Sequence, residues 1–333
     1  MSRPGVLVVG AGSIGSRHVR NLRQLGVQNL AVCDPDAPRR GALARELGIP
    51  AFAGLDEALA GVRAAAVFVC TPPALHVPAC RKAVAAGAHL FVEKPLSSRR
   101  EGVSELAAEA TAAGRLVQVG YNLRFHPVVR RVRDLVSQGA VGRPLWGAAE
   151  VAAYLPDWRP AQDYRRNYTA RRELGGGIIL DGSHEIDYLV WMLGRPDRVL
   201  CMGGRVSRLE VDVEDCATML LHFPSGMHVD VHMDFVQQGY VRTGKLAGEE
   251  GTLAWSLADQ YVKRYLPREK RWETETFLFD LNQMYLDEAA HFLECVEKGR
   301  APLVGLEDGR AALGVALAAL RSMESGRAEV PEY

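Results

Sequence analysis

Two spacings of apolar residues divide the chain. Over the first 120 residues, short Val-rich runs bounded by Gly, Pro or Asp alternate with Ala- and Leu-rich stretches of helical spacing. Such short apolar runs are typical of strands buried on both faces, so we expect a doubly wound parallel sheet of the α/β class. The expected strands are Val6–Val9, Leu30–Cys33, Ala66–Cys70, Leu90–Val92 and Leu116–Val119, and the expected helices are Ile14–Leu25, Arg39–Leu47, Leu75–Ala86 and Gly102–Ala113.

The pattern changes after about residue 121, where apolar and polar residues begin to alternate one by one in several segments. It is clearest in Met227–Phe235, where Met, Val and Phe occupy one face and His and Asp the other. We expect residues 1–121 to form the first domain and residues 122–333 an α+β domain with an open, mainly antiparallel sheet and helices on one face. Its expected elements are helices at Pro127–Gln138, Ser183–Leu193, Leu281–Lys298 and Glu307–Ser325, and strands at Val199–Val206, Ala217–Phe223, Met227–Phe235 and Tyr240–Leu246.

Composition narrows the possible partners. The 333 residues are 48% hydrophobic and 24% charged, and 40 basic residues balance 40 acidic ones. A net charge of zero offers no field for nucleic acid or an anionic membrane, and no apolar stretch reaches spanning length. The N-terminus shows no secretory leader, and the six cysteines form no Cys-x-x-Cys pair. We therefore expect a cytoplasmic protein with a small-molecule partner, no nucleic acid, no membrane and no metal.

A glycine pattern follows the first expected strand. Gly10, Gly12 and Gly15 have the Gly-x-Gly-x-x-Gly spacing, with Ser13 and Ile14 between the last two, and the pattern leads into the next expected helix. In this context the pattern predicts a dinucleotide-binding Rossmann domain whose helix N-terminus faces the pyrophosphate.

The end of the second expected strand bears on the choice of cofactor. Asp34 ends that strand, where a carboxylate binds ribose hydroxyls and repels a 2′-phosphate. The sequence therefore favours NAD, with NADP possible because Arg39 and Arg40 are close by.

Two later strand ends carry the candidate chemistry of this domain. Thr71-Pro72-Pro73 follows one apolar run and Glu93-Lys94-Pro95 another. Ligands of doubly wound sheets bind at the carboxyl ends of the strands, so both segments are expected beside the cofactor. Lys94 is the candidate group to polarise a substrate hydroxyl or to carry its proton.

The second domain offers a histidine between carboxylates. Asp181, His184 and Asp187 follow one another at steps of three, after Gly175-Gly-Gly177. On a helix His184 and Asp187 share a face. Removing a hydride from an alcohol requires a base for the hydroxyl proton, and histidine has a suitable pKa. These three residues are therefore the catalytic candidates of the second domain.

Two further clusters keep alternative interpretations. Tyr164 and Arg165, in an aromatic and Arg-rich loop, fit a sugar pocket, but equally a covering loop or an interface arm. The row His228, Asp230, His232 and Asp234 invites a metal site, but neighbouring same-face residues of one strand stand about 7 Å apart. That distance suits two ligands of one ion poorly, so a metal site is not the preferred interpretation of that row.

Taken together, these residues resemble the Gfo/Idh/MocA family of oxidoreductases over essentially the whole chain. The marks are Gly10–Gly15, Asp34, Thr71-Pro-Pro with His76, Glu93-Lys-Pro95, Asn122-x-Arg124-Phe-x-Pro127, Gly175–Asp187 and Gly305-Leu-Glu-Asp-Gly309. The resemblance implies NAD(P)-dependent oxidation or reduction of a hydroxyl of a sugar, cyclitol, nucleotide sugar or related polyol.

The resemblance also assigns roles to residues. It implies that Lys94 contacts nicotinamide and substrate, that the Lys-Pro bond is often cis, and that His184 is the acid/base. Further cofactor contacts are expected from Thr71, Pro72, His76, Glu93 and Asn122, and substrate contacts from Arg124, Tyr164, Arg165, Asp181 and His184. It further implies a homodimer or homotetramer formed through the open sheet face.

One departure and two alternatives stay open at this point. Many relatives separate the Asp and His of this motif by four positions, whereas Asp181 and His184 are three apart. Asp187 or Glu185 could therefore orient His184 instead of Asp181. The alternative functions are an NAD-dependent glycosidase that recycles the hydride and a non-catalytic nucleotide or sugar sensor on the same fold.

Overall fold

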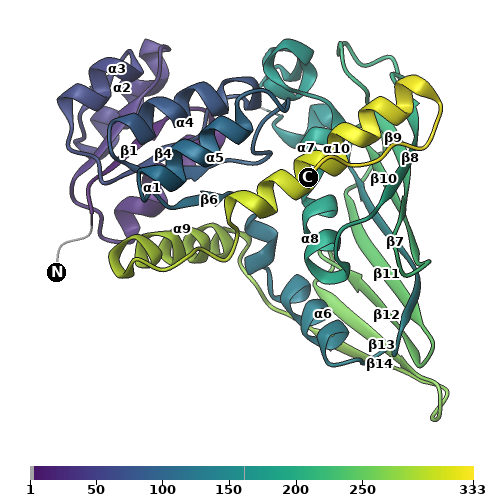
Figure 1. Ribbon diagram of the computed structural model, residues 1–333. Coiled ribbons are helices and arrows are strands. Elements are labelled where there is room, and N and C mark those ends of the chain that lie inside the picture. Colours follow the sequence, from purple (N-terminus) through teal and green to yellow (C-terminus); the bar gives the residue numbers. More distant parts are fainter. Residues whose placement is uncertain (1–3, 161) are drawn as a thin grey trace. The chain divides into compact units, whose positions relative to one another are not determined.

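The computed structural model describes residues 4–160 and 162–333, which divide into two compact units (Figure 1). The first unit comprises the chain up to Asn122 together with Leu281–Arg310, and the second comprises Leu123–Asp280 and Ala311–Tyr333. The first change of unit thus falls next to the expected boundary. The return of Leu281–Arg310 to the first unit was not part of the expectation of two contiguous domains.

The first unit contains a six-stranded parallel sheet, which confirms the predicted doubly wound fold. The strand order reverses beside β1, so the carboxyl ends of β1 and β4 flank the switch point where such sheets bind ligands. In sheet order the strands are β3 (Ala51–Phe52), β2 (Leu30–Cys33), β1 (Val6–Val9), β4 (Ala66–Val69), β5 (His89–Val92) and β6 (Val117–Val119).

Helices of this unit come from both ends of the chain. Phe292 of α9 packs edge-on against Phe68 and Phe91, so this late helix closes the core over one face of the early sheet (Figure 1). The helices of the unit are α1 (Ser13–Gln24), α2 (Ala37–Leu47), α3 (Leu55–Gly61), α4 (His76–Ala85), α5 (Val103–Ala112) and α9 (Leu281–Lys298).

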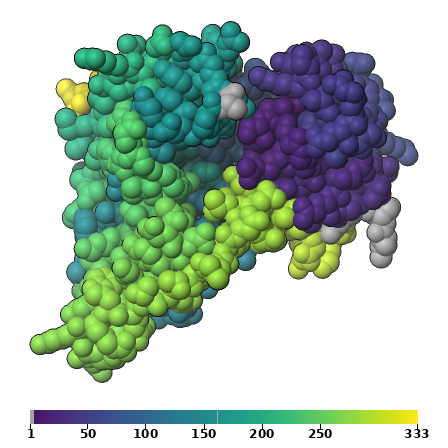
Figure 2. Space-filling model, turned by 180° about the vertical axis from the view of Figure 1, so that it is seen from behind, coloured from purple at the N-terminus to yellow at the C-terminus, as the bar shows by residue number. Residues whose placement is uncertain are grey.

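The second unit is built on an eight-stranded sheet in which only β7 and β10 pair in parallel. This confirms the expected mainly antiparallel sheet. The hairpin of its last two strands stands out from the unit (Figures 1 and 2). In sheet order the strands are β14 (Arg271–Thr276), β13 (Tyr261–Leu266), β12 (Gly251–Ser256), β11 (Val241–Gly248), β7 (Pro144–Ala152), β10 (His228–Asp234), β9 (Cys216–His222) and β8 (Arg198–Gly204).

Helices cover one face of this sheet and leave the other open (Figure 1). The alternation predicted for β10 is present: Val229, Val231 and Met233 are fully buried, whereas His228 on the other face is exposed. The helices are α6 (Pro127–Ser137), α7 (Ile178–Asp181), α8 (Ser183–Leu193) and α10 (Leu306–Ser325). Four short 3-10 turns, Leu155–Trp158, Tyr164–Arg166, Tyr168–Ala170 and Arg172–Leu174, lie in the described part of the aromatic and Arg-rich loop and just after it.

Several elements were not predicted because their sequences lack an apolar period. Strand β14 is exposed at all six positions, and β7 is rich in Ala and Gly, which have low strand propensity. Strand β3 has two residues and α7 has four, too few to form a pattern. Tertiary pairing rather than local preference therefore fixes these elements.

The open face combines polar and apolar side chains. Strand register brings Trp146 beside His228, and the Trp146 indole donates to Asp230 at 2.8 Å. Leu200 and Met202 of β8 are exposed on this sheet. Among the described residues, no three His, Cys, Asp or Glu side chains gather as metal ligands would.

Helix α6 begins at a buried histidine. The Nδ1 atom of His126 accepts a hydrogen bond from the amide of Val128 at 3.2 Å, and its ring meets Phe279 edge-on. An Nδ1 that accepts an amide proton carries none itself. Burial, with the charge of Arg242 as a second cause, lowers the pKa of His126 to about 4.

The depressed pKa of His126 predicts a pH dependence of stability. Between pH 6.5 and 4 the unfolded chain binds a proton at His126 that the folded chain does not bind. The free energy of unfolding should therefore decrease as the pH drops through this window, so the folded protein becomes less stable. The loss should reach up to about 3 kcal/mol. His126→Asn keeps a capping oxygen without the titration, and urea unfolding at pH 5 and 7.5 should show a flatter dependence. The exposed His228→Asn is the control, and equal slopes in wild type and His126→Asn would contradict the prediction.

Candidate active site

The glycine loop joins β1 to α1, and its three glycines meet different demands. A Cβ at Gly15 would lie 1.8 Å from the carbonyl oxygen of Gly10, and one at Gly10 would lie 2.5 Å from that of Cys70. Both glycines are therefore required by the fold itself. A Cβ at Gly12 would meet nothing within 4 Å. The protein alone does not require glycine there, so the open space at Gly12 is available to a ligand.

The N-terminus of α1 is left available for an anion. Gly12 caps the helix without a side-chain hydrogen bond, and its first turn, which starts with Ser13 and Ile14, contains no acidic residue. The first amides of a helix point outward with the positive end of the dipole. This end of α1 therefore fits the pyrophosphate of a dinucleotide.

Asp34 lies at the same loop, directly after β2. Its Oδ2 accepts a hydrogen bond from the amide of Ala11 at 2.6 Å, and its Oδ1 accepts one from the amide of Asp36 at 2.7 Å. The guanidinium of Arg40 donates to the main-chain carbonyl of Asp34 rather than to its carboxylate. The carboxylate thus lies at the position expected for the adenosine ribose, with Arg40 bound to the main chain beside it.

Two buried polar atoms lie at further strand ends of this sheet. Thr71, with Pro72, follows β4, and Asn122 comes shortly after β6. Neither the Oγ1 of Thr71 nor the Oδ1 of Asn122 has a hydrogen-bond partner within the described residues. Buried polar groups are normally paired, so unsatisfied atoms here suit a polar ligand. With the open Gly12 and the Asp34 carboxylate, these residues fit a nicotinamide dinucleotide.

His76, expected near the cofactor, faces into the protein. Its Nδ1 lies 2.9 Å from the carbonyl oxygen of Pro95, and its Nε2 lies 2.8 Å from that of Thr71. Burial lowers the pKa of His76, although both carbonyls act in the opposite direction. His76 therefore links the strand ends that carry Thr71 and Lys94.

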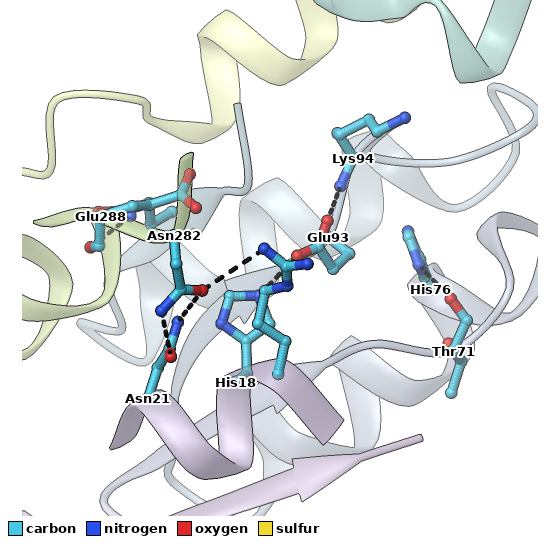
Figure 3. Close-up of polar contacts among 10 residues, drawn as sticks. His18, Asn21, Thr71, His76, Glu93, Lys94, Asn282 and Glu288 are labelled. Carbon is cyan, nitrogen blue, oxygen red and sulfur yellow. Dashed lines mark hydrogen bonds and ion pairs between the residues drawn. The ribbon is translucent and has the colours of Figure 1, made fainter. Parts of the chain in front are cut away.

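Glu93 and Lys94 follow β5 and point in different directions (Figure 3). The Glu93 carboxylate is buried and lies 2.7 Å from the Nε2 of His18, while its other oxygen accepts from the amide of Lys94 at 3.2 Å. Glu93 is thus bound to His18 and to the main chain of Lys94, and its contact with the cofactor stays a prediction. Lys94 is partly exposed, and its peptide bond to Pro95 is cis.

In the second unit, glycines bring the chain close to its neighbours before His184. A Cβ at Gly176 would lie 2.2 Å from the carbonyl of Tyr168, and one at Gly177 would lie 2.2 Å from the Glu214 carboxylate. Burial raises the pKa of Glu214, whose Oε1 accepts from the amide of Ile179. The triplet therefore holds the short helix α7, which ends at Asp181, against the rest of the unit.

The three carboxylates near His184 differ in their partners. Asp187 forms a buried two-bond ion pair with Arg124, at 2.7 and 2.9 Å, and Glu185 forms one with Arg242, at 2.7 Å for each bond. Asp181 instead accepts from two hydroxyls, the hydroxyl of Tyr168 at 2.9 Å and that of Thr169 at 3.0 Å. Arginines thus pair with two of the three carboxylates, whereas the third accepts hydrogen bonds from these two hydroxyls.

Some expected substrate contacts have other partners. Arg124 is 1% exposed and binds Asp187. Arg165 forms ion pairs with Asp163 and Glu210 at the surface, and Tyr164 accepts a hydrogen bond from the amide of Glu210. The substrate-binding roles of Arg124, Tyr164 and Arg165 stay predictions.

His18, Tyr168 and Thr169 were not singled out from the sequence. A signal existed for His18, because a polar residue falls on the buried face of α1 beside Val19 and Leu22. For Tyr168 and Thr169 we find no comparable signal, since their loop has no periodic pattern.

Comparison with known proteins agrees with this geometry. Residues 5–121 match the family described as "Oxidoreductase family, NAD-binding Rossmann fold", and residues 129–254 match the "GFO/IDH/MocA C-terminal domain". The chain therefore belongs to the Gfo/Idh/MocA family of oxidoreductases, and its first unit is the NAD-binding domain of that family. This confirms the resemblance, the enzyme class and the cofactor predicted from the sequence.

Individual relatives match over nearly the full length. The chain is 29% identical to the 1,5-anhydro-D-fructose reductase of Ensifer adhaerens, covering 98% of each chain. It is 27% identical to the scyllo-inositol 2-dehydrogenase (NAD(+)) of Bacillus subtilis, covering 96% of this chain and 94% of that one. The crystal structure of GenD2 from gentamicin A biosynthesis in complex with NAD superposes with a TM-score of 0.86 at 26% identity, covering 100% of this chain and 97% of that one.

None of the helices in the described ranges combines the length and the apolarity needed to cross a bilayer.

The contrast between Gly12 and Gly15 predicts separable effects. Gly12→Ala should leave the melting temperature unchanged and weaken NAD binding by about tenfold or more, because only the bound cofactor would meet the new methyl group. Gly15→Ala should destabilise the fold by about 3 kcal/mol or more through its backbone clash. Calorimetric NAD titration and thermal unfolding measure the two effects. Unchanged NAD affinity in Gly12→Ala would contradict the assignment.

The carboxylates near His184 should differ in their effect on stability. Asp187→Asn or Glu185→Gln leaves a buried arginine without its counter-charge, at a cost of about 3–5 kcal/mol. Asp181→Asn keeps an acceptor for the hydroxyls and should cost about 1 kcal/mol. Urea denaturation of the three variants measures this order, and equal losses would show that the ion pairs do not distinguish the sites.

Proposed function

We propose that this chain transfers a hydride between NAD and a hydroxyl-bearing carbon of a sugar, cyclitol, nucleotide sugar or related polyol. The observation that carries the proposal is the position of Lys94 at the carboxyl end of β5, in the same sheet whose β1 and β2 lead to the glycine loop and Asp34. The named relatives, a reductase of 1,5-anhydro-D-fructose and a scyllo-inositol dehydrogenase, support this substrate class.

Residues of the first unit would hold the cofactor along the sheet edge. The amides of the loop Gly10–Gly15 would bind the pyrophosphate, and the Asp34 carboxylate would accept the adenosine ribose hydroxyls, which favours NAD over NADP. Thr71, Pro72 and Asn122 would line the nicotinamide end. When bound, the oxidised nicotinamide ring accepts a hydride from the substrate carbon.

His184 and Lys94 would handle the hydroxyl proton. His184 accepts it as the alcohol is oxidised, while the Lys94 ammonium polarises the hydroxyl oxygen. A neighbouring carboxylate stabilises the protonated imidazole. Asp181 suits this role because Asp187 and Glu185 are each committed to a buried ion pair with an arginine, whereas Asp181 accepts from the hydroxyls of Tyr168 and Thr169. We therefore assign support of His184 to Asp181, and to Asp187 the role of fixing Arg124 within the unit.

The assembly state and the location are also part of the proposal. Leu200 and Met202 on β8 and Leu220 on β9 are exposed large apolar residues of the open sheet. Exposed apolar groups rimmed by polar ones are typical of interfaces, so this face supports a homodimer or homotetramer. A cytoplasmic location stays a prediction. The glycosidase and sensor alternatives gain no support from relatives that are dehydrogenases or reductases.

Substrate screening with matched variants tests the proposed reaction. Polyols, sugar acids and nucleotide sugars are offered with NAD⁺ or NADP⁺, and net NADH formation is followed by absorbance. Lys94→Ala and His184→Ala should each lower kcat by about 10²–10⁴-fold. Lys82→Ala, a surface lysine paired with Asp56, and the exposed His228→Ala are the controls and should keep full activity. Near-normal turnover in both site variants would refute the assignment, and turnover without net NADH would favour the glycosidase.

A further inference from the structure

His18 holds the residue that precedes Lys94. It is fully buried on α1, and its ring packs against Phe68 and Phe91 with centroids 5.4 and 5.0 Å away. Its Nε2 lies 2.7 Å from a carboxylate oxygen of Glu93 (Figure 3), while its Nδ1 has no hydrogen-bond partner in the described part of the chain. A proton on Nε2 would be donated to this carboxylate oxygen, whereas a proton on Nδ1 would be buried without an acceptor.

The carboxylate that His18 binds is fixed from two more directions. The second oxygen of Glu93 accepts the amide proton of Lys94, so the side chain closes back on the main chain of the next residue. On another side, a Cβ at Gly120 would lie 3.2 Å from that same oxygen. Glu93 therefore has little room to change rotamer, and the amide of Lys94 is tied to it.

His76 holds the residue that follows Lys94. Its ring is 1% exposed and bridges the carbonyl of Pro95 and that of Thr71. Figure 3 shows His76 beside Thr71, on a different element from His18. The main chain around Lys94 is thus held before and after the lysine by imidazoles from α1 and α4.

Packing alone does not explain these two histidines. The pocket of His18 is aromatic, and an apolar side chain would fill it without burying a carboxylate beside it. Buried polar pairs contribute less to stability than apolar residues of equal volume, and their best-supported use is to specify one arrangement. The arrangement specified here is the main chain of Glu93, Lys94 and Pro95.

We propose that His18 and His76 are positioning residues that together aim the Lys94 ammonium, without contacting the substrate themselves. The inference rests on the proposed role of Lys94. It extends that role to two histidines that lie far from Lys94 in the sequence. It also couples the direction of Lys94 to α1, the helix whose N-terminus would hold the pyrophosphate.

A first experiment observes Lys94 directly and needs no substrate. The six lysines are reductively methylated with ¹³C-formaldehyde, and Lys94→Arg assigns the Lys94 resonance. His18→Leu and His76→Leu should shift or broaden that resonance alone. His89→Leu is the matched control, because His89 starts the strand that leads to Glu93 and bonds the amide of Leu116. It should lower the melting temperature and leave the Lys94 signal unchanged.

Conservative variants separate positioning from stability. His18→Gln keeps a donor near the Nε2 position and should restore the Lys94 signal. His76→Asn keeps a donor toward Pro95, whereas His76→Gln keeps one toward Thr71, so His76→Asn should restore the signal better. Once a substrate is known, the leucine variants should lower kcat by about 10–100-fold with KM for NAD within about threefold, since a displacement of about 1 Å can cost 10²-fold.

The outcomes distinguish the two proposals. An unchanged Lys94 resonance in folded His18→Leu and His76→Leu, or an equal change in His89→Leu, overturns the positioning role. If the leucine variants do not fold, identical Lys94 signals in His76→Asn and His76→Gln overturn the role of His76, and a His18→Gln signal that differs from wild type overturns that of His18. A shifted resonance together with full activity of Lys94→Ala would refute the catalytic role of Lys94 and leave the positioning intact.

Discussion

The first unit depends on a carboxylate buried where an unpaired charge would be prohibitive. The two carboxylate oxygens of Glu93 bind the ring of His18 and the amide of Lys94. Burial of Glu93 without these bonds would be costly, so it favours the arrangement that holds α1 against the end of β5. That requirement joins α1 to the end of β5 across 75 positions of sequence. The helix that would bind phosphate and the lysine that would meet the substrate are therefore parts of one rigid body, rather than two loops that must find each other.

The second unit uses charge in a related way around His184. Buried ion pairs at Glu185 and Asp187 tie the first turns of α8 to Arg242 and Arg124. Burying such a pair costs desolvation free energy, but separating the two charges inside the protein would cost more. The ion pairs therefore favour the one rotation of α8 in which both carboxylates reach their arginines. Asp181, on the preceding short helix, binds hydroxyls instead. The carboxylate group thus pairs with arginine at two positions and accepts hydroxyl hydrogen bonds at the third.

The sequence predicts those features whose pattern lies within a few neighbouring residues. Strands buried on both faces and helices ending in glycine carry their pattern within a few residues, so β1, β2, β4 and β5 were expected almost at their observed bounds. Strand β14 has no apolar face, and its position depends on pairing with β13. The glycines of the first loop and Asp34 were recognisable because each is defined by its position directly after a predicted strand. The partners of Glu93, Asp181 and Asp187 were not, because each bond depends on segments that meet only after folding.

The return of α9 to the first unit has a consequence for how the protein is made. Phe292 completes the aromatic cluster with Phe68 and Phe91, and α9 ends at Lys298 of 333 residues. Synthesis on the ribosome therefore has to pass through the whole second sheet and reach α9 before that core can close. Until then the nascent nucleotide-binding unit exposes an apolar surface, so the usual order in which an N-terminal domain folds first cannot be completed here. Cellular folding factors would meet this chain with its first domain still open.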